Sequence, residues 1–489
     1  MYLGLDLGTS ALKAVLLAES GEVLDIESVE VATQRPQPLW VEQQPEEWWQ
    51  ATRAALQALG KRQGLGRLSA IGLSGHMHGA VLLNADGEVI RPCIMWNDGR
   101  SSRECEELEN SLADFRERSG NVAMPGFTAP KLQWVRNHES DHFTRVARVL
   151  LPKDYLRFRL TGDYITEMSD AAGTLWLNPA KRDWDDELLR ITGLNRAHMP
   201  ALIEGSCVSG MVSGEVAAAL GLPVVPVVGG AGDNAAGAIR VGVTRPGQGF
   251  ISLGTSGVYF VVSDKHCAAP EHTVHAFCHC LPDRWHQMSV MLSAASSLEW
   301  FAGIAGSTVP ELLQELKTLG ITDTEVTFLP YLSGERTPHN NPLACAQFFG
   351  MTASTTRPAM TLAVLEGVAF SFADGEAALR AAGTPLDDIS LIGGGARSAH
   401  WRQIIADVLQ RTLYFREGGE VGPGLGAARL AQLGLASDDQ ATIDTLCPPP
   451  RIVQTHKPDA LRAPYYQRGL ARYRRLYAQT VSLNQPESA

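Results

Sequence analysis

Cysteine is scarce in this sequence: the chain has 8 cysteines among 489 residues, and they follow no paired spacing. This excludes a small scaffold held together by disulfides and makes a reduced, cytoplasmic setting the expectation. The sequence also lacks an N-terminal basic segment followed by an apolar core, so we expect no signal peptide. The longest apolar stretch, 216–232, is interrupted by Pro223 and Pro226, which excludes a membrane-spanning helix there.

An excess of positive charge is absent as well. Lys and Arg number 42 against 53 Asp and Glu, which gives a formal net charge of −11. Surfaces that bind nucleic acid or anionic membranes need clustered Lys and Arg, so neither partner is expected. The length predicts two or three domains, and without a low-complexity tract or an evident flexible linker these should pack closely.

The most informative feature that is present is the tetrapeptide Leu-Gly-Thr-Ser, which occurs at 7–10 and again at 253–256. Each copy lies between two alternating apolar runs, a pattern that predicts a β-hairpin. The glycine and the two hydroxyl residues of each turn could hold phosphate oxygens through backbone N–H groups and side chains: Gly8, Thr9, Ser10, Gly254, Thr255 and Ser256. Two such hairpins suggest two related halves facing one nucleotide, the outline of a phosphotransferase.

The second half is expected to begin near residue 245, just before the second hairpin, which predicts domains 1–244 and 245–489. In the first domain, 1–33 is typical of a three-stranded meander, and Pro45 suits the first position of a helix. In the second domain we expect a strand over 389–392, a helix over 401–409 and a C-terminal helix over 460–483.

Two aspartates stand at the ends of predicted strands. Asp6 directly precedes the first turn, where a carboxylate either holds Mg²⁺, usually through water, or only organises the turn. The second copy has Ser252 in place of Asp6, so we expect one metal site. Asp233 follows a buried strand and precedes a helix. A helix N-cap and a general base toward a substrate hydroxyl are its two compatible roles, because the helix end would keep the carboxylate ionised.

Two polar loops follow other predicted strands. The loop 75–79 places His76 and His78 two positions apart, and without a third ligand at useful spacing contacts to a polyol fit better than zinc. The loop 96–100 contains Asp98 and Arg100, which either contact a substrate or form a local ion pair.

Three further segments stay ambiguous. The run 272–280 is rich in His and Cys, but strand-like alternation would send these side chains to opposite faces, which favours a structural role over a metal site. The glycine-rich turn 393–398 is either a platform for an adenine or ribose or an ordinary strand-to-helix turn. The polar loop 332–339 has no deducible role beyond an Arg–Glu pair near the cleft.

Taken together, these segments resemble the FGGY family of carbohydrate kinases over almost the whole chain. The segment 126–138, GFTAPKLQWVRNH, is similar to that family's N-terminal signature. The segments 75–79, 96–100, 151–155, 169–173, 232–234 and 333–338 are similar to bacterial members that phosphorylate a pentulose.

The resemblance implies the α/β fold shared with actin and hexokinase (ribonuclease H-like): two domains, each with a mixed five-stranded sheet flanked by helices, and a cleft between them that closes over ATP. It implies transfer of the γ-phosphate of ATP to O5 of D-xylulose, with Mg²⁺ as cofactor, and a homodimer. Ribulose, fuculose, gluconate and glycerol are the competing substrates. A chaperone-like ATPase is a further alternative, but only about fifty residues follow the second half, too few for a peptide-binding domain.

Carried over by position, the resemblance makes Asp233 the catalytic base and Asp6 the carboxylate linked to Mg²⁺. Sugar contacts would come from Met77, His78 and Asn234, with Trp96 and Asp98 as further candidates. Contacts to ATP would come from the two hairpins, the following strand and the glycine-rich turn: Gly8, Thr9, Ser10, Lys13, Gly254, Thr255, Ser256, Gly394, Gly395, Ala396 and Arg397. The family often has Gln in place of His76, so we expect this imidazole to alter the pocket rim or the pH response.

Overall fold

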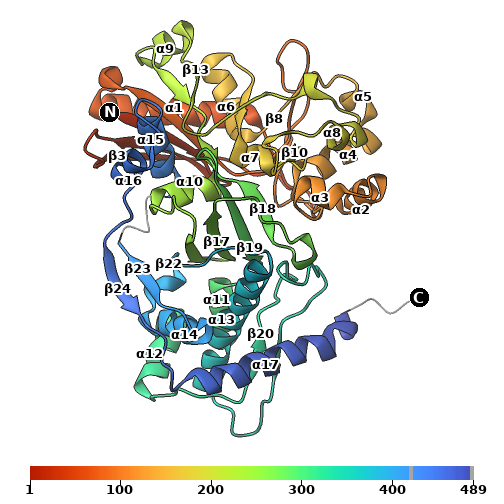
Figure 1. Cartoon of the computed structure of the whole chain (residues 1–489), viewed down its shortest axis with the longest axis vertical. Helices are drawn as coiled ribbons and strands as arrows, with labels where there is room; N and C mark the ends of the chain where they lie inside the picture. The colour runs from red at the N-terminus through yellow and green to blue at the C-terminus, as the bar shows by residue number, and fades with distance from the viewer. Residues whose placement is uncertain (418–421, 485–489) are drawn as a thin grey trace.

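Two mixed β-sheets of seven strands each form the framework of the molecule (Figure 1). The computed structural model describes residues 1–417 and 422–484. Helices flank both sheets, which confirms the predicted class of two α/β domains with mixed sheets.

The first sheet has the strand order β13–β14–β5–β1–β2–β3, and β15 also pairs with β5. The predicted hairpin is formed by β1 and β2, which are antiparallel, whereas β5 runs parallel to β1. The strands are β1 (Tyr2–Leu7), β2 (Ala11–Leu17), β3 (Val23–Glu30), β5 (Ala70–Gly75), β13 (Val208–Met211), β14 (Pro226–Val228) and β15 (Ala231–Gly232).

The second sheet repeats this plan with the order β18–β19–β17–β16–β22–β23–β24. Its hairpin is formed by β16 and β17, and β22 runs parallel to β16. The strands are β16 (Gln248–Leu253), β17 (Gly257–Ser263), β18 (His275–Cys278), β19 (Trp285–Met291), β22 (Asp388–Ile392), β23 (Leu413–Arg416) and β24 (Ile452–His456).

The predicted number of five strands per sheet is too low. Five consecutive positions do correspond between the sheets, β3–β2–β1–β5–β14/β15 and β19–β17–β16–β22–β23. The additional strands β13, β18 and β24 lie at the edges. The strand β18 falls within the alternating run 272–280, whereas β13 and β24 are too short to carry much periodic signal. The fifth position of the first sheet is divided into β14 and β15, and between them Gly230 adopts a left-handed φ of 75°.

Helices form where the sequence supplies both an apolar face and favourable ends. The helix α1 (Pro45–Gln63) begins with proline and two glutamates and ends with Lys61 and Arg62, which suits the helix dipole. The other main helices are α2 (Ser102–Ser111), α4 (Thr128–His138), α6 (Pro152–Thr161), α7 (Met168–Ala172), α10 (Asp233–Arg240), α11 (Ala295–Ile304), α12 (Val309–Thr318), α13 (Arg357–Ala381), α14 (Ala399–Leu409) and α17 (Ala463–Thr480). Across residues 1–417 and 422–484, no helix is long and apolar enough to cross a membrane.

Two helices of the second half lie on the first sheet. The helix α15 (Pro423–Leu433) packs against β1, β5 and α10, and α16 (Gln440–Leu446) contributes Ile443 to the same core (Figure 1). The approach of α15 is close because glycine leaves room for backbone. A Cβ at Gly4 would lie 1.9 Å from the carbonyl oxygen of Gly424, and one at Gly426 would lie 1.9 Å from that of Ala236. The first sheet and α10 are therefore held by segments from both halves of the sequence.

Candidate functional site

Asp6 and Asp233 lie near the carboxyl ends of strands in the first sheet. In the register of the sheet, Asp6 is opposite Lys13 on β2 and Ser74 on β5. Asp233 follows β15, which pairs in parallel with the end of β5, and it is the first residue of α10. The ends of parallel strands meet at one edge of a sheet, so the two carboxyl groups are neighbours.

The environment of each carboxyl group changes its acidity. Burial raises the pKa of Asp6 to about 6, against the opposing effects of the neighbouring Ser74 side chain and the charge of Lys13. Burial and the nearby Asp6 raise the pKa of Asp233 to about 7. The N-cap position of α10 is occupied by Gly232, so Asp233 does not fill it. The predicted N-cap role is therefore wrong, and burial leaves the pKa of Asp233 where a group can accept a proton at neutral pH.

A cavity of about 260 Å³, the central cavity, lies beside Asp233 and is lined by both halves of the chain. Of the predicted sites it brings together Met77, His78, Trp96, Asp233, Asn234 and Ser256. The side-chain Nδ2 of Asn234 donates to Oδ1 of Asp233 at 3.0 Å, which orients the carboxyl group. A hydroxyl compound, a candidate base and the end of a phosphate-type hairpin can thus meet in one space.

His78 presents an acceptor nitrogen in this cavity. Its Nδ1 lies 2.7 Å from the carbonyl oxygen of Gly173, and because a carbonyl only accepts, Nδ1 must carry the proton. Burial lowers the pKa of His78 to about 3, so the ring is neutral and Nε2 remains as an acceptor. Lys131 fixes the loop by donating to the carbonyl oxygens of His78 at 2.9 Å and Gly126 at 2.7 Å. The left-handed φ of 71° at His78 is held by these contacts.

Asp98 and His76 do not take the places that the sequence suggested. Asp98 is buried outside the central cavity, where its Oδ2 lies 2.7 Å from Nη2 of Arg100 and accepts from the backbone N–H of Val41. Of the two alternatives for Asp98, the structure supports the ion pair over the sugar contact, because its oxygens are used up by structural donors. His76 is buried with its ring edge-on to Trp48, away from the rim of the cavity. Burial lowers the pKa of His76 to about 3, so it does not titrate near neutral pH.

The second half supplies lining residues to which the sequence analysis gave no binding role. His275 and Phe277 lie two positions apart on β18 and both face the central cavity, whereas Cys278 points to the carbonyl oxygen of Pro179. Arg336, from the polar loop 332–339, lines the same cavity. The alternation of 272–280 was read correctly, but nothing in the sequence indicates which face of the strand meets the cavity.

Both phosphate-type hairpins form tight turns at the predicted positions. In the first, Oγ1 of Thr9 accepts from Nε1 of Trp96 at 3.0 Å, which joins the turn to the wall of the central cavity. In the second, the carbonyl oxygen of Gly254 accepts from the first backbone N–H of α11 at 2.8 Å. The side chains of Thr255 and Ser256 are exposed and available to a ligand.

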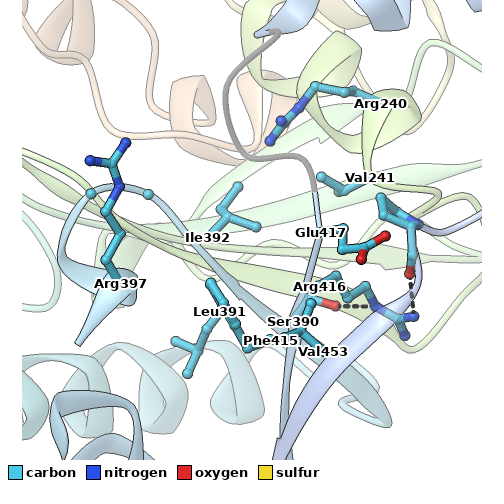
Figure 2. A pocket seen from close by; sticks show the side chains of 13 residues that line it. Arg240, Val241, Ser390, Leu391, Ile392, Arg397, Phe415, Arg416, Glu417 and Val453 are labelled. Carbon is cyan, nitrogen blue, oxygen red and sulfur yellow. Dashed lines mark hydrogen bonds between the residues drawn. The ribbon is translucent and has the colours of Figure 1, made fainter. Parts of the chain in front are cut away.

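A second cavity of about 590 Å³, the distal cavity, lies at the end of β22 (Figure 2). Gly394 and Arg397 of the glycine-rich turn line it, together with Phe415 and Arg416. The other two predicted residues of the turn do not: Ala396 is fully buried, and a Cβ at Gly395 would lie 2.6 Å from the side chain of Leu253. These two residues lie on the face of the turn that packs against the second sheet, away from the cavity.

One helix connects the two cavities. Asp233 begins α10 beside the central cavity, and Arg240 ends it at the wall of the distal cavity, where Figure 2 shows its side chain above β22. At 1.5 Å of rise per residue the two ends are about 10 Å apart. A ligand that reaches from the distal cavity to Asp233 therefore has to span about this distance.

A buried ionic network lies directly behind Asp233. Lys153 is fully buried, and its Nζ lies 2.7 Å from Asp154, 3.1 Å from Asp170 and 3.4 Å from Glu167. Glu167 caps α7 and accepts from Oγ of Ser169 at 2.9 Å. The same Ser169 oxygen accepts from the backbone N–H of Gly232 at 3.1 Å, one residue before Asp233. The network therefore fixes the backbone that carries the candidate base.

The comparisons with known proteins agree with this arrangement. The FGGY family of carbohydrate kinases matches the chain with its N-terminal domain over residues 1–240 and with its C-terminal domain over residues 249–435. The chain belongs to this family. It is 51% identical over 484 residues to the xylulose kinase of Escherichia coli (strain K12). The alignment covers 99% of this chain and 100% of that relative.

Two solved kinase structures share the fold over the whole length. A xyloylose kinase from Brucella ovis is 46% identical with a TM-score of 0.94, and a xylulose kinase from Rhodospirillum rubrum is 30% identical with a TM-score of 0.92. Each comparison covers 99% of both chains. The protein is therefore a carbohydrate kinase, and the fold shared with actin and hexokinase is confirmed.

Proposed function

We propose that this FGGY kinase transfers the γ-phosphate of ATP to O5 of D-xylulose, giving D-xylulose 5-phosphate and ADP. The observation that carries the proposal is the central cavity, in which Asp233, His78 and Ser256 face one space. The identity of about half of all residues with a relative that is a xylulose kinase supports the choice of sugar.

Asp233 is the base in this proposal. With the pKa of its carboxyl group near 7, it takes the proton from O5 as the oxygen attacks the γ-phosphorus, and Asn234 keeps the acceptor oxygen in position. Proton removal contributes about 10²- to 10⁴-fold to the rate. The rest of the acceleration comes from the positioning of sugar and nucleotide, because phosphoryl transfer relies mainly on alignment and charge stabilisation.

The sugar is held mainly by the first half of the chain. Nε2 of His78 accepts a hydrogen bond from a sugar hydroxyl, and Met77 packs against the carbon chain. The adenosine occupies the distal cavity beside Gly394 and Arg397, and the two hairpins with Lys13 hold the phosphates. The apolar side chains that line the central cavity exclude water, which would otherwise compete with the sugar for the phosphoryl group.

Asp6 fits a magnesium ion. Its carboxylate is a hard oxygen donor at the phosphate-type turn, the kind of ligand that Mg²⁺ prefers. In the part of the chain that the structure describes, no group of three or more His, Cys, Asp or Glu could hold a metal, so water and the nucleotide must supply the other ligands. When bound, the ion would neutralise charge on the phosphates of ATP. Asp6 would orient it through water.

A direct test is to incubate the protein with ATP, Mg²⁺ and D-xylulose and to analyse the product by ³¹P and ¹H NMR. The proposal predicts a phosphomonoester signal coupled to the two protons on C5. Coupling to protons on C1 would refute the assigned position, and the absence of any sugar phosphate would refute the reaction.

A further inference from the structure

Arg336 places a positive charge at the wall of the central cavity without a carboxylate partner. Among the residues that the structure describes, no Asp or Glu oxygen lies within ion-pair distance of its guanidinium. Within the described part of the chain, the one hydrogen bond of this side chain joins Nη1 to Nε2 of His275 at 3.4 Å. A guanidinium can only donate, so His275 accepts with Nε2 and its ring is neutral.

The neighbouring Glu335 does not neutralise Arg336. Its Oε1 accepts from the backbone N–H groups of Leu292 at 3.0 Å and of Arg336 itself at 2.7 Å. Burial raises the pKa of Glu335 to about 8, so this carboxyl group is largely uncharged at pH 7. The Arg–Glu pair expected from the sequence is therefore not formed between the side chains.

The loop that carries Arg336 is fixed to the second sheet. Oγ1 of Thr337 donates to the carbonyl oxygen of Thr273 at 3.0 Å, and its backbone N–H donates to the carbonyl oxygen of Val290 at 3.0 Å. The carbonyl oxygen of Arg336 accepts from Oγ1 of Thr273 at 3.0 Å. These bonds hold the backbone that carries the Arg336 side chain before any ligand arrives, which lowers the entropy that binding must overcome.

A charged group that is half-buried without a counter-ion is costly, and here most of its surroundings cannot accept a hydrogen bond. Phe127, Phe277, Met288 and Val290 line the cavity around it. Its unused N–H groups need an oxygen-rich ligand. The ring of Phe127 packs edge-on against His78 at 4.8 Å and against His275, the partner of Arg336, at 5.4 Å. Arg336 and His78 line the same cavity, so Arg336 faces its sugar end.

We propose that Arg336 is a sugar-binding residue contributed by the second half of the chain, donating to the acceptor's oxygens opposite His78 and Asp233. This inference rests on the proposed function. Because His78 and Asp233 belong to the first half, the sugar then bridges the two sheets and draws them together over the nucleotide. Such bridging couples sugar binding to closure and keeps ATP from water until a sugar is present.

The test is isothermal titration of D-xylulose into the nucleotide-free protein and into Arg336→Gln and Arg336→Lys. The matched control is Arg357→Gln, since Arg357 lies exposed on α13 and pairs with Glu315. Hydrogen bonds to a charged group contribute about 1.5–3 kcal/mol, so the sugar Kd of Arg336→Gln should rise about 10- to 150-fold. Arg336→Lys should show a smaller rise, because it keeps the charge but loses the planar fork. The Kd for ADP should stay within about twofold of wild type in every variant, because Arg336 does not line the distal cavity.

An unchanged sugar Kd in Arg336→Gln, with an ADP Kd that shows a folded site, would overturn the inference. If Arg336→Gln does not fold, Arg336→Lys decides: wild-type sugar affinity in that variant overturns it equally. Failure of the proposed function gives a different result, since wild type would then not bind D-xylulose. The sugar that the enzyme does phosphorylate would replace D-xylulose in the same titration.

Discussion

The substitution Asp233→Asn tests two properties of Asp233: its role as the base in catalysis, and the effect of its buried carboxyl group on the free energy of unfolding. Asn retains the shape of the side chain and an oxygen that accepts from Asn234, so the variant should fold and bind ADP as wild type does. Without a base the transfer should slow by about 10²- to 10⁴-fold in kcat. The KM for ATP should change little, because Asp233 does not line the distal cavity.

The same substitution should stabilise the ligand-free protein at high pH. The pKa of Asp233 is raised from 3.8 to about 7, roughly 3 units, which at about 1.36 kcal/mol per unit sets an upper limit of about 4 kcal/mol. Asp233 is partly exposed to the cleft, and solvent reduces the effect, so we expect about 1–2 kcal/mol.

The sign follows from proton linkage. A carboxyl group with a raised pKa in the folded state contributes stability below the unfolded pKa near 4, and that contribution is lost as the pH rises through about 7. Asn does not titrate, so the advantage of Asp233→Asn should be greatest at pH 8 and smaller at pH 5. Urea unfolding at both pH values measures it, with Asp86→Asn on an exposed turn as the control. An advantage that does not depend on pH would refute the assigned environment of Asp233, and wild-type kcat would remove it from the mechanism.

The remaining predictions concern three other parts of the molecule. His78→Ala should raise the KM for D-xylulose about 10- to 100-fold in steady-state assays and leave the Kd of ADP unchanged; unaltered sugar kinetics would dismiss its role. Lys153→Met leaves three buried carboxyl groups without their central cation, so the free energy of unfolding in urea should fall by about 3–5 kcal/mol and kcat should drop. A wild-type urea midpoint would contradict that account. Gly394→Leu should fold normally, since Gly394 has a φ of −62° and open space at Cβ, yet raise the KM for ATP at least about tenfold by filling the distal cavity. Equal values of that KM would show that the adenosine lies elsewhere.

The sequence was most informative about structure that neighbouring residues determine. The two hairpins, the strand that ends beside Asp6 and the helix that begins at Asp233 follow from alternation and turn residues, which act over a few positions. The short edge strands β13 and β24 were missed because each pairs with a strand that is well separated from it along the chain. The return of α15 to the first sheet likewise depends on close backbone contact between residues more than 400 positions apart, such as Gly4 and Gly424.

The sequence predicted several lining residues of the central cavity in the first half but only Ser256 in the second half. Met77, His78 and Asn234 follow strand ends, where a sequence pattern can be recognised. His275 and Arg336 line the cavity because the second half packs against the first. The spacing of residues along the chain does not predict that contact. Asp98 was wrongly predicted to contact the sugar because it also follows a strand. Its carboxylate instead pairs with Arg100, two residues away.

The account's central claim is that a sugar hydroxyl and ATP meet beside Asp233, with D-xylulose as the acceptor. The most direct test is ADP release with ATP and Mg²⁺ across D-xylulose, D-ribulose, L-ribulose, gluconate and glycerol, with a sugar-free control. We predict the highest kcat/KM for D-xylulose and little hydrolysis without sugar. A higher kcat/KM on another polyol would contradict the substrate, and ATP turnover indifferent to every sugar would contradict the mechanism itself.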